Sequence, residues 1–264
     1  LHLGRMETGK ISEGQSVEME IDEDRRLALM RHHSATHLLN KSLRDVLGDH
    51  ILQTGSLVAE NYLRFDFSHP DKISGADLEK IEEQVNKAIT SDAEVSTNVL
   101  PIEEAKKSGA LATFGEKYGE EVRVVSMGNG DLSIEFCGGC HVDRTGQIQY
   151  FHILKESSPG AGNRRIEAVA GPGVVDYFSR EFHRLQLERS NLEGSLQGLS
   201  NQLKESASED APELQKELDQ LKPVQEIPEA SSVRSTLESA AGVLKLQNQL
   251  VCVDEELREK QKLR

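Results

Sequence analysis

The spacing of apolar positions predicts three helices in the first part of the chain. The longest runs from Asp24 to Leu47, because apolar residues recur there every three or four positions. Ser74 precedes a second helix, Ala76–Ile89, and Pro101 can start a short third one, Ile102–Lys107. The apolar face of the first helix consists of Leu27, Met30, Ala35, Leu38, Leu39, Leu43, Val46 and Leu47.

Runs of alternating apolar and polar residues predict strands between these helices. They cover residues 51–58, 63–67, 94–100, 122–127, 132–136, 148–154 and 164–169. Gly128-Asn129-Gly130 predicts a tight turn between two of them. Strands and helices mixed in this way predict an α+β domain over residues 23–172, with a mixed or antiparallel sheet.

The two ends of the chain differ from this domain. Residues 1–22 alternate like short strands, which predicts the end of a small β-barrel-like unit. Gly171-Pro172-Gly173 marks a boundary, and residues 173–264 space their leucines by three, four and seven, which predicts a coiled-coil-like helical extension. Prolines interrupt this extension, so that it either folds back as a hairpin or contains a flexible tether over residues 200–230.

Composition places the chain among soluble proteins. No apolar run approaches the roughly 18 residues that span a bilayer, and no signal-peptide pattern is present. Three cysteines, with only Cys137 and Cys140 close together, do not make a disulfide framework, so we expect a cytoplasmic protein with reduced thiols. The chain begins with Leu1 and ends in a charged stretch, and we expect it to be part of a longer protein.

The charge of the chain argues against a broad surface for nucleic acid. The formal net charge is −14; residues 1–172 hold 19 basic against 28 acidic residues, and residues 173–264 hold 12 against 17. Phosphate contacts normally require a basic face. We therefore expect any RNA to bind through a local patch such as Arg164 and Arg165, with the remaining affinity supplied by parts outside this chain.

Two groups of side chains point to a metal site. His33 and His37 are four residues apart on the predicted helix and share one face, while Cys137-Gly138-Gly139-Cys140-His141 gathers thiols and an imidazole on a flexible turn. Together they suit one tetrahedral zinc ion, either with both cysteines or with Cys137 and His141. The alternative is a pair of buried thiols beside unrelated histidines. We expect His32 to be a solvated or supporting neighbour.

Six motifs, in this order, resemble the editing region of alanyl-tRNA synthetases, and the match covers nearly all of residues 1–172. They are His33-Ser34-Ala35-Thr36-His37-Leu38-Leu39, Gln53-Thr54-Gly55-Ser56-Leu57-Val58, Leu63-Arg64-Phe65-Asp66-Phe67-Ser68-His69, Phe114-Gly115-Glu116-Lys117-Tyr118, Cys137-Gly138-Gly139-Cys140-His141 and Gly162-Asn163-Arg164-Arg165-Ile166-Glu167-Ala168. The resemblance implies the zinc ligands His33, His37, Cys137 and His141. Cys140 departs from the threonine usual in that family, which leaves open a ligand swap or a second reactive thiol.

The resemblance implies hydrolysis of the ester that joins a wrong serine or glycine to alanine tRNA. A synthetic pocket for alanine excludes these two amino acids poorly, so a second site must sort the products. We expect Thr36 and Gln53 to recognise the substrate; alternatively, Thr36 bonds back to its own helix and Gln53 is an exposed strand residue. We expect Arg164 and Arg165 to grip phosphate or ribose, unless they form a salt bridge with a nearby acid such as Glu167.

The resemblance also sets expectations about cofactors and partners. Four protein ligands are typical of a closed zinc site, so zinc either organises the pocket and anchors the substrate or expands to five-coordination. ATP belongs to the aminoacylation part, which this sequence lacks, so we expect no aminoacylation by this chain. The expected partners are alanine tRNA and the rest of the synthetase, with the helical extension a candidate for homodimerisation; we expect no membrane contact.

Three other interpretations compete with this one. The editing domain of threonyl-tRNA synthetases shares the histidine and cysteine pattern, but the glycine turn and the helical extension favour alanine. Free-standing editing proteins that act on aminoacyl-tRNA lack such a long helical extension. The third alternative is a noncatalytic, zinc-stabilised oligomerisation module, in which the metal only holds the fold together.

Overall fold

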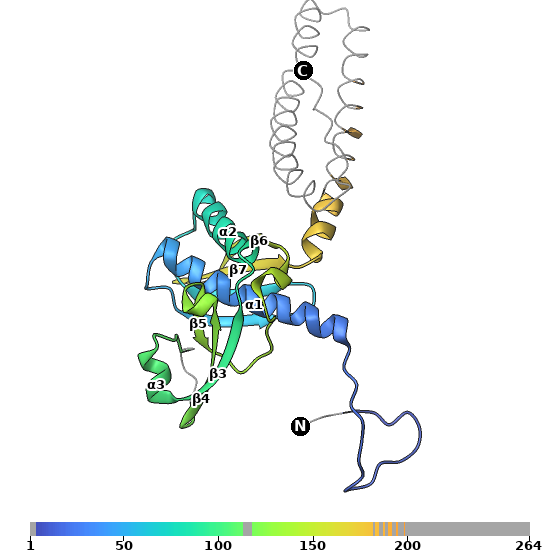
Figure 1. The fold of residues 1–264 in the computed structure, drawn as a ribbon. Helices are drawn as coiled ribbons and strands as arrows, with labels where there is room; N and C mark the ends of the chain where they lie inside the picture. Colours follow the sequence, from blue (N-terminus) through green and yellow to red (C-terminus); the bar gives the residue numbers. More distant parts are fainter. Residues whose placement is uncertain are drawn as a thin grey trace, which may run out of the picture.

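The computed structural model describes residues 4–112, 118–181 and scattered helical positions up to residue 198. Helices and antiparallel strands are both present in this part of the chain (Figure 1), which confirms the predicted α+β class. In chain order the elements are α1 (Glu23–Leu47), β1 (Gln53–Val58), β2 (Leu63–Ser68), α2 (Gly75–Thr90), β3 (Val95–Pro101), α3 (Ile102–Lys107), β4 (Glu121–Met127), the 3-10 turn η1 (Gly128–Gly130), β5 (Ser133–Phe136), the 3-10 turn η2 (Thr145–Ile148), β6 (Phe151–Gly160) and β7 (Asn163–Ala170).

The strands form two antiparallel sheets. The larger sheet has the order β1-β2-β7-β6, and the smaller one has the order β3-β4-β5. In β2, Phe65 and Phe67 point to the buried face while the residues between them are partly exposed, which is the alternation that a sheet with one covered face requires. Of the two predicted sheet types, the antiparallel one is therefore present.

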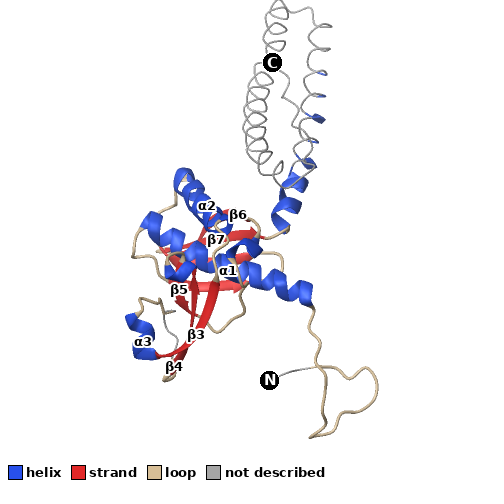
Figure 2. Cartoon of the chain, in the orientation of Figure 1, coloured by secondary structure: helices blue, strands red, loops and turns tan. Residues whose placement is uncertain are grey.

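Helix α1 runs through the interior and carries part of the candidate site. The carboxylate of Asp22 accepts a hydrogen bond from the Arg25 backbone N–H at 2.9 Å and caps its first turn, and Gly48 ends it with a positive φ of 116°. Buried positions occur on several sides of its middle turns, not along a single stripe. The reason is that α2, β2, β5 and β7 all contact α1 (Figure 2).

One hydrophobic core joins α1, α2 and the two sheets. Its members include Leu38 and Leu39 of α1, Ile81 of α2, Phe65 of β2 and Met127 of β4. A smaller cluster packs α3 against β4 and β5. Burying an aliphatic or aromatic side chain of this size contributes about 1.5–3 kcal/mol, so the shared core fixes α1 relative to both sheets.

The segment before α1 differs from the prediction. Residues 4–22 contain turns and loops but no helix or strand, although a strand pattern was expected up to Ile21. Met19 is 80% exposed and Ile11 is 63% exposed. A strand needs a partner to satisfy its backbone, and no described residue pairs with this segment. The assignment of residues 1–22 to a β unit stays a prediction.

The start and the length of β6 also differ from the prediction. Residues 145–148 form η2, and Gln149 has a φ of 73°, so the chain turns before the strand begins at Phe151. The strand then continues to Gly160 through polar, partly exposed residues. Their pairing with β7 is a backbone interaction that leaves no apolar alternation in the sequence.

A helix begins directly after the larger sheet. Residues 173–181 are helical, and Val174 and Phe178 pack against Val169 of β7. The ring of His152 in β6 lies 4.6 Å from the ring of Phe178. The predicted coiled coil beyond this start, residues 200–230 and the Phe114–Lys117 part of the fourth motif lie outside the described residues.

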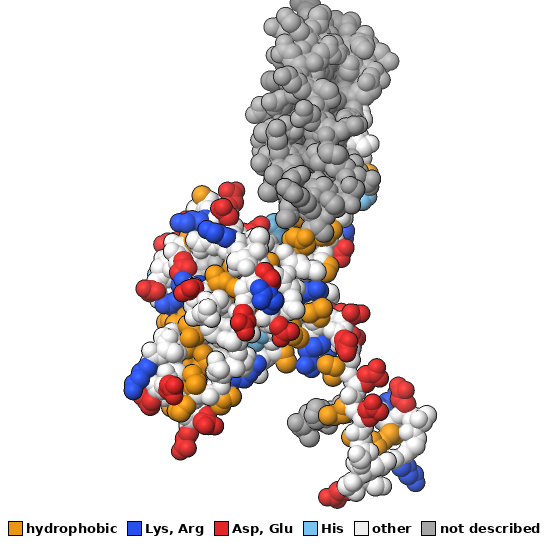
Figure 3. All heavy atoms as spheres, in the orientation of Figure 1, with side chains coloured by type: hydrophobic (Ala, Val, Ile, Leu, Met, Phe, Trp, Pro, Cys, Tyr) orange, Lys and Arg blue, Asp and Glu red, His pale blue; other side chains and the backbone are white. Residues whose placement is uncertain are grey.

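Two surface properties follow from the structure. In the part of the chain that the structure describes, no helix combines the length and the apolar character needed to cross a lipid bilayer. On the face drawn in Figure 3, acidic and basic side chains are interspersed over the folded region. The local RNA contacts expected at Arg164 and Arg165 stay a prediction.

Candidate metal centre and substrate cleft

The structure brings together the side chains of His33, His37, Cys137 and His141. One possible ligand atom from each of the four lies within 4.8 Å of the others. The sulfur of Cys137 is 3.3 Å from Nε2 of His33 and 3.3 Å from Nε2 of His141. Two residues come from one face of α1, and two come from the loop after β5. Imidazole nitrogens and thiolate sulfur are both zinc ligands, and four of them suit its tetrahedral geometry.

The second side of the His37 ring is fixed by Glu135. Nδ1 of His37 lies 2.8 Å from Oε2 of Glu135. The other carboxylate oxygen, Oε1, accepts hydrogen bonds from Asn40 Nδ2 at 3.0 Å and from the Ser133 hydroxyl at 3.2 Å. Nε2 of His37 is buried and has no hydrogen-bond partner. A ring with the proton on Nδ1 leaves an unused lone pair on Nε2, which is how carboxylate–histidine pairs present a ligand to zinc.

His141 is oriented in a similar way by Ser34. The Ser34 hydroxyl oxygen lies 3.2 Å from Nδ1 of His141 and accepts a hydrogen bond from the Val142 backbone N–H at 3.2 Å. When Nε2 of a neutral imidazole binds a metal, the ring proton is on Nδ1. The Ser34 oxygen can accept a hydrogen bond from that N–H group. Ser34 is completely buried on α1, so the helix supplies both two ligands and the support for a third.

The surroundings of the cluster shift the pKa values of His37, Cys137 and His141. Burial opposes the charged form of His37, but the Glu135 carboxylate outweighs it and raises the pKa of His37 to about 10. Burial also opposes the Cys137 thiolate, yet hydrogen bonds from His141 and His33 lower its pKa to about 3. Burial lowers the pKa of His141 to about 4. These shifts favour the Cys137 thiolate and the neutral His141 that metal ligation requires, and zinc binding would displace the Nε2 proton that the raised pKa of His37 favours in the metal-free chain.

Cys140 lies outside this cluster. It is exposed, and Nη1 of Arg26 lies 3.5 Å from its sulfur. Of the two ligand sets that the sequence left open, the structure groups the one containing His141. The donor set and the orphaned Nε2 of His37 fit a zinc ion.

A cleft of about 380 Å³ opens beside the cluster. Its lining includes His33, His37 and Cys137 as well as Thr36 and Gln53, the two residues nominated for substrate recognition. Thr36 donates its hydroxyl proton to the His32 carbonyl at 2.8 Å, as its alternative interpretation anticipated. That bond leaves the oxygen lone pairs of Thr36 as acceptors. Nε2 of Gln53 donates to the Ser56 hydroxyl at 3.3 Å.

Arg164 and Arg165 do not line this cleft. Arg165 forms a two-pronged ion pair with Asp66 of β2, with both N–O distances at 2.7 Å, and Arg164 pairs with Glu156 of β6. The partners come from neighbouring strands and do not include Glu167. Because β7 lies inside the sheet, these pairs support its strand register, and a role for the two arginines in tRNA binding stays a prediction.

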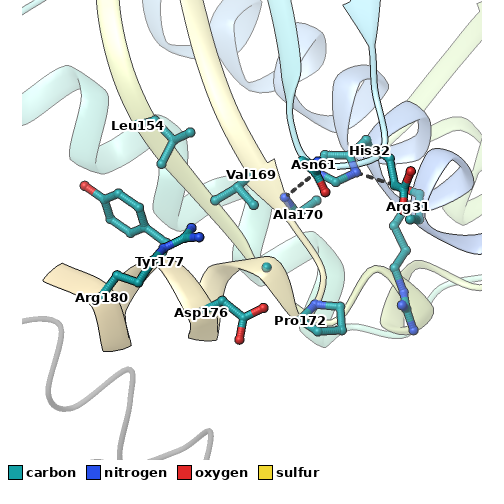
Figure 4. A pocket seen from close by; sticks show the side chains of 13 residues that line it. Arg31, His32, Asn61, Leu154, Val169, Ala170, Pro172, Asp176, Tyr177 and Arg180 are labelled. Atoms are coloured by element: carbon teal, nitrogen blue, oxygen red, sulfur yellow. Dashed lines mark hydrogen bonds between the residues drawn. The ribbon is translucent and has the colours of Figure 1, made fainter. Parts of the chain in front are cut away.

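His32 differs from the expectation of a solvated neighbour, because only 2% of it is exposed. Its Nε2 accepts a hydrogen bond from the Ala170 backbone N–H at 3.1 Å, and Nδ1 bonds to the Ala28 carbonyl at 2.9 Å (Figure 4). Burial lowers its pKa. His32 thus ties α1 to the end of β7 as a neutral ring, and it supports the fold without joining the metal cluster.

His32 also borders a second cleft, of about 480 Å³, at the start of the C-terminal helix. Figure 4 shows Arg31 and Arg180 on its two sides with Asp176 between them. The second cleft shares no described lining residue with the cleft beside the cluster.

Sequence reasoning did not identify the residues that orient the ligands, which are Ser34, Asn40, Ser133 and Glu135. Ser34 and Asn40 are polar residues on the otherwise apolar face of α1, and this exception to the pattern is a signal for a buried partner. Glu135 has a weaker signal, because a single acid in a short strand is usually exposed.

The chain is similar to a known family and to several curated proteins. The family described as "Threonyl and Alanyl tRNA synthetase second additional domain" matches residues 122–167. The alanine–tRNA ligase of Leptospira borgpetersenii serovar Hardjo-bovis (strain JB197) is 56% identical over 192 residues, which cover 73% of this chain and 20% of that protein. The alanine–tRNA ligase of Acidithiobacillus ferridurans is 44% identical over 243 residues, or 92% of this chain and 27% of that protein.

The chain corresponds to a segment of an alanyl-tRNA synthetase. A third relative, the alanine–tRNA ligase of Leptospira interrogans serogroup Icterohaemorrhagiae serovar copenhageni (strain Fiocruz L1-130), is 55% identical over 192 residues, which are 19% of its length. The chain thus spans between about a fifth and a quarter of these alanyl-tRNA synthetases. These named relatives favour the alanyl over the threonyl type among the family's two branches.

Proposed function

We propose that this part of an alanyl-tRNA synthetase is an editing deacylase, which hydrolyses the ester between alanine tRNA and a wrongly attached serine or glycine. The observation that carries the proposal is the position of Thr36 and Gln53 in the same cleft as the cluster of His33, His37 and Cys137. Polar recognition groups beside a candidate metal centre are an arrangement that can support metal-assisted ester hydrolysis. The family match and the relatives support it.

The ligands of zinc would be His33, His37, Cys137 and His141. When bound, zinc supplies a positive centre that can hold the substrate's amino group or polarise the ester. Glu135 keeps the proton of His37 on Nδ1, and Ser34 does the same for His141. These residues therefore set the orientation of the cluster before substrate arrives, which lowers the cost of binding.

The other cleft residues would select the substrate and place the water. The Thr36 oxygen, whose proton is engaged with the His32 carbonyl, accepts a hydrogen bond from the serine hydroxyl or from the amino group. Gln53 lines the same cleft from β1, and its amide can orient the attacking water. Compared with serine, alanine lacks the hydroxyl and leaves a polar acceptor unpaired, which favours the release of serine over alanine. Glycine lacks the hydroxyl as well, so this acceptor accounts for the selection of serine alone.

The test is the deacylation of serine-charged and alanine-charged alanine tRNA by the purified chain and by His37→Ala. We expect serine to be released faster than alanine by about a hundredfold or more, with release falling to the uncatalysed rate in His37→Ala. His69→Ala is the matched control, because His69 pairs with His50 outside the cleft and its loss should not change the rate.

The noncatalytic oligomerisation module predicts a different result. A folded, zinc-loaded chain that leaves serine-charged tRNA intact, even when the rest of the synthetase is added, would support that module and contradict the editing proposal. Circular dichroism of each variant shows whether the fold is retained.

A further inference from the structure

Arg123 of β4 forms hydrogen bonds to the Cys137–Cys140 turn, which carries the cysteine of the cluster. Its Nη1 donates hydrogen bonds to two carbonyl oxygens of the turn, that of Cys137 at 3.0 Å and that of Gly139. Its backbone carbonyl also accepts a hydrogen bond from the Cys137 N–H at 2.9 Å. One residue thus holds the turn through both its side chain and its backbone.

The far side of the guanidinium is fixed as well. Nη2 of Arg123 donates to the Thr97 hydroxyl of β3 at 3.3 Å. The neighbouring strand β3 pairs with β4 in register, Val99 opposite Arg123. The guanidinium is therefore held between a strand of the smaller sheet and the turn, and its planar fork cannot rotate without breaking one of these bonds.

The turn needs such a support because of its composition. Gly138 and Gly139 have no side chains to pack, and a Cβ at Gly138 would meet nothing within 4 Å. Glycine also loses the most conformational freedom when it is ordered. At Gly139 the backbone lies against His33, since a Cβ there would be 2.1 Å from Cε1 of that ring. The position of the turn thus decides where Cys137 and His33 meet.

We propose that Arg123 is a positioning residue for the metal centre: it holds the Cys137–Cys140 turn so that the Cys137 thiolate reaches the three histidines. The inference rests on the proposed function, because it assumes that the cluster binds zinc. Arg123 also lines the substrate cleft, so that its displacement would alter the cleft wall at the same time. A lysine cannot replace it, since one ammonium group cannot span two carbonyls and the Thr97 hydroxyl.

The test compares Arg123→Ala and Arg123→Lys with the unaltered chain of 264 residues. Zinc affinity is measured by competition with a chelator, and cobalt(II) is used in place of zinc because its thiolate charge-transfer absorption reports the Cys137 sulfur directly. We expect both variants to bind zinc roughly 10–100-fold more weakly, with a weakened or shifted cobalt–thiolate absorption. Thr97→Val, which removes only the Nη2 acceptor, should give a smaller loss.

Arg44→Ala is the matched control. Nη1 of Arg44 also donates to two loop carbonyls, those of Asp49 at 3.1 Å and Ile51 at 2.9 Å, but that loop carries none of the four cluster residues. Arg44→Ala should lower the thermal stability of the chain without changing the cobalt absorption. If Arg123→Ala does not fold, Arg123→Lys and Thr97→Val still decide the question.

Two results would overturn the inference, and they are distinguishable. If the unaltered chain binds neither zinc nor cobalt, the proposed metal centre itself fails. If the unaltered chain binds both metals and deacylates serine-charged tRNA, while the Arg123 variants match it and Arg44→Ala in zinc affinity and in cobalt absorption, only the role of Arg123 fails.

Discussion

At the scale of single residues, the candidate site depends on nitrogen atoms that are already assigned. His37 and His141 each use Nδ1 for a protein partner and keep Nε2 for the cluster. The partners are different in kind, a carboxylate and a hydroxyl. A carboxylate that accepts a hydrogen bond from an imidazole raises the basicity of that ring. Glu135 therefore makes His37 a stronger electron donor than His141.

Gly139 offers a test of how tightly the cluster is packed. In Gly139→Ala the new methyl group would lie 2.1 Å from Cε1 and 2.6 Å from Nδ1 of His33, so the ring must move away. We expect zinc affinity to fall by about tenfold or more, as measured by chelator competition. Gly138→Ala is the control, because nothing lies within 4 Å of the added Cβ. Equal affinities in the two variants would refute this packing.

The sequence predicted the cluster residues better than their surroundings. The four-residue spacing of His33 and His37 and the short Cys137–His141 loop are local patterns, which can be recognised from the sequence alone. The contact between Asn40 and Glu135 joins residues 95 positions apart. No periodicity within either segment encodes such a contact, so it becomes visible only when the fold is known.

At the scale of elements, the pair of His37 and Glu135 joins α1 to β5. Its charges are buried, so removing one partner is costly. The pKa of Glu135 lies below its ordinary value of 4.5, because the attraction of His37 outweighs burial. The pair therefore stabilises the metal-free chain fully above about pH 4.5 and up to pH 6.5, and its contribution is lost as pH rises through the raised pKa of His37 near 10.

Glu135→Gln tests this pH window. We expect the substitution to lower the free energy of unfolding of the chelator-treated chain by about 1–3 kcal/mol at pH 6, and by less at pH 10.5, where His37 is neutral in both proteins. Urea titrations at the two pH values measure this. A loss that is the same at both values would mean that only the hydrogen bonds from Asn40 and Ser133 are missed.

Helices and strands were predicted well where one face is buried. The alternation in Leu63–Phe67 gave β2 to within one residue, and the apolar spacing gave α1 to within one residue of its start. Prediction failed where backbone pairing alone makes the structure, as in the polar end of β6. At residues 4–22 alternation is present but no described strand supplies a partner, so the β unit expected there stays a prediction.

At the scale of the whole molecule, a metal at the cluster would link α1, packed on the larger sheet, with the loop that leaves the smaller one. At a zinc concentration about 1,000 times its dissociation constant, binding adds about 4 kcal/mol to stability. For a domain of this size that corresponds to a rise of roughly 10 °C in melting temperature. We therefore expect a chelator to lower the melting temperature of the unaltered chain by about this amount.

His37→Ala provides the comparison for this measurement. Because one ligand and the Glu135 pair are missing, its melting temperature should start lower and respond little to zinc or chelator in differential scanning calorimetry. A chelator effect of equal size in both proteins would place the stabilising metal elsewhere in the chain.

The distance along the chain between the two halves of the cluster has a consequence for how the protein is made. His33 and Cys137 are separated by 104 positions. Closing so long a loop costs conformational entropy, and the cluster is complete only once the chain from α1 to His141 has been made. During synthesis, a ribosome that has released α1 still has to deliver everything up to His141, so the nascent chain spends that interval with exposed histidines and no thiolate to complete the set. A zinc ion held by all four residues could therefore be captured only after His141 has left the ribosome.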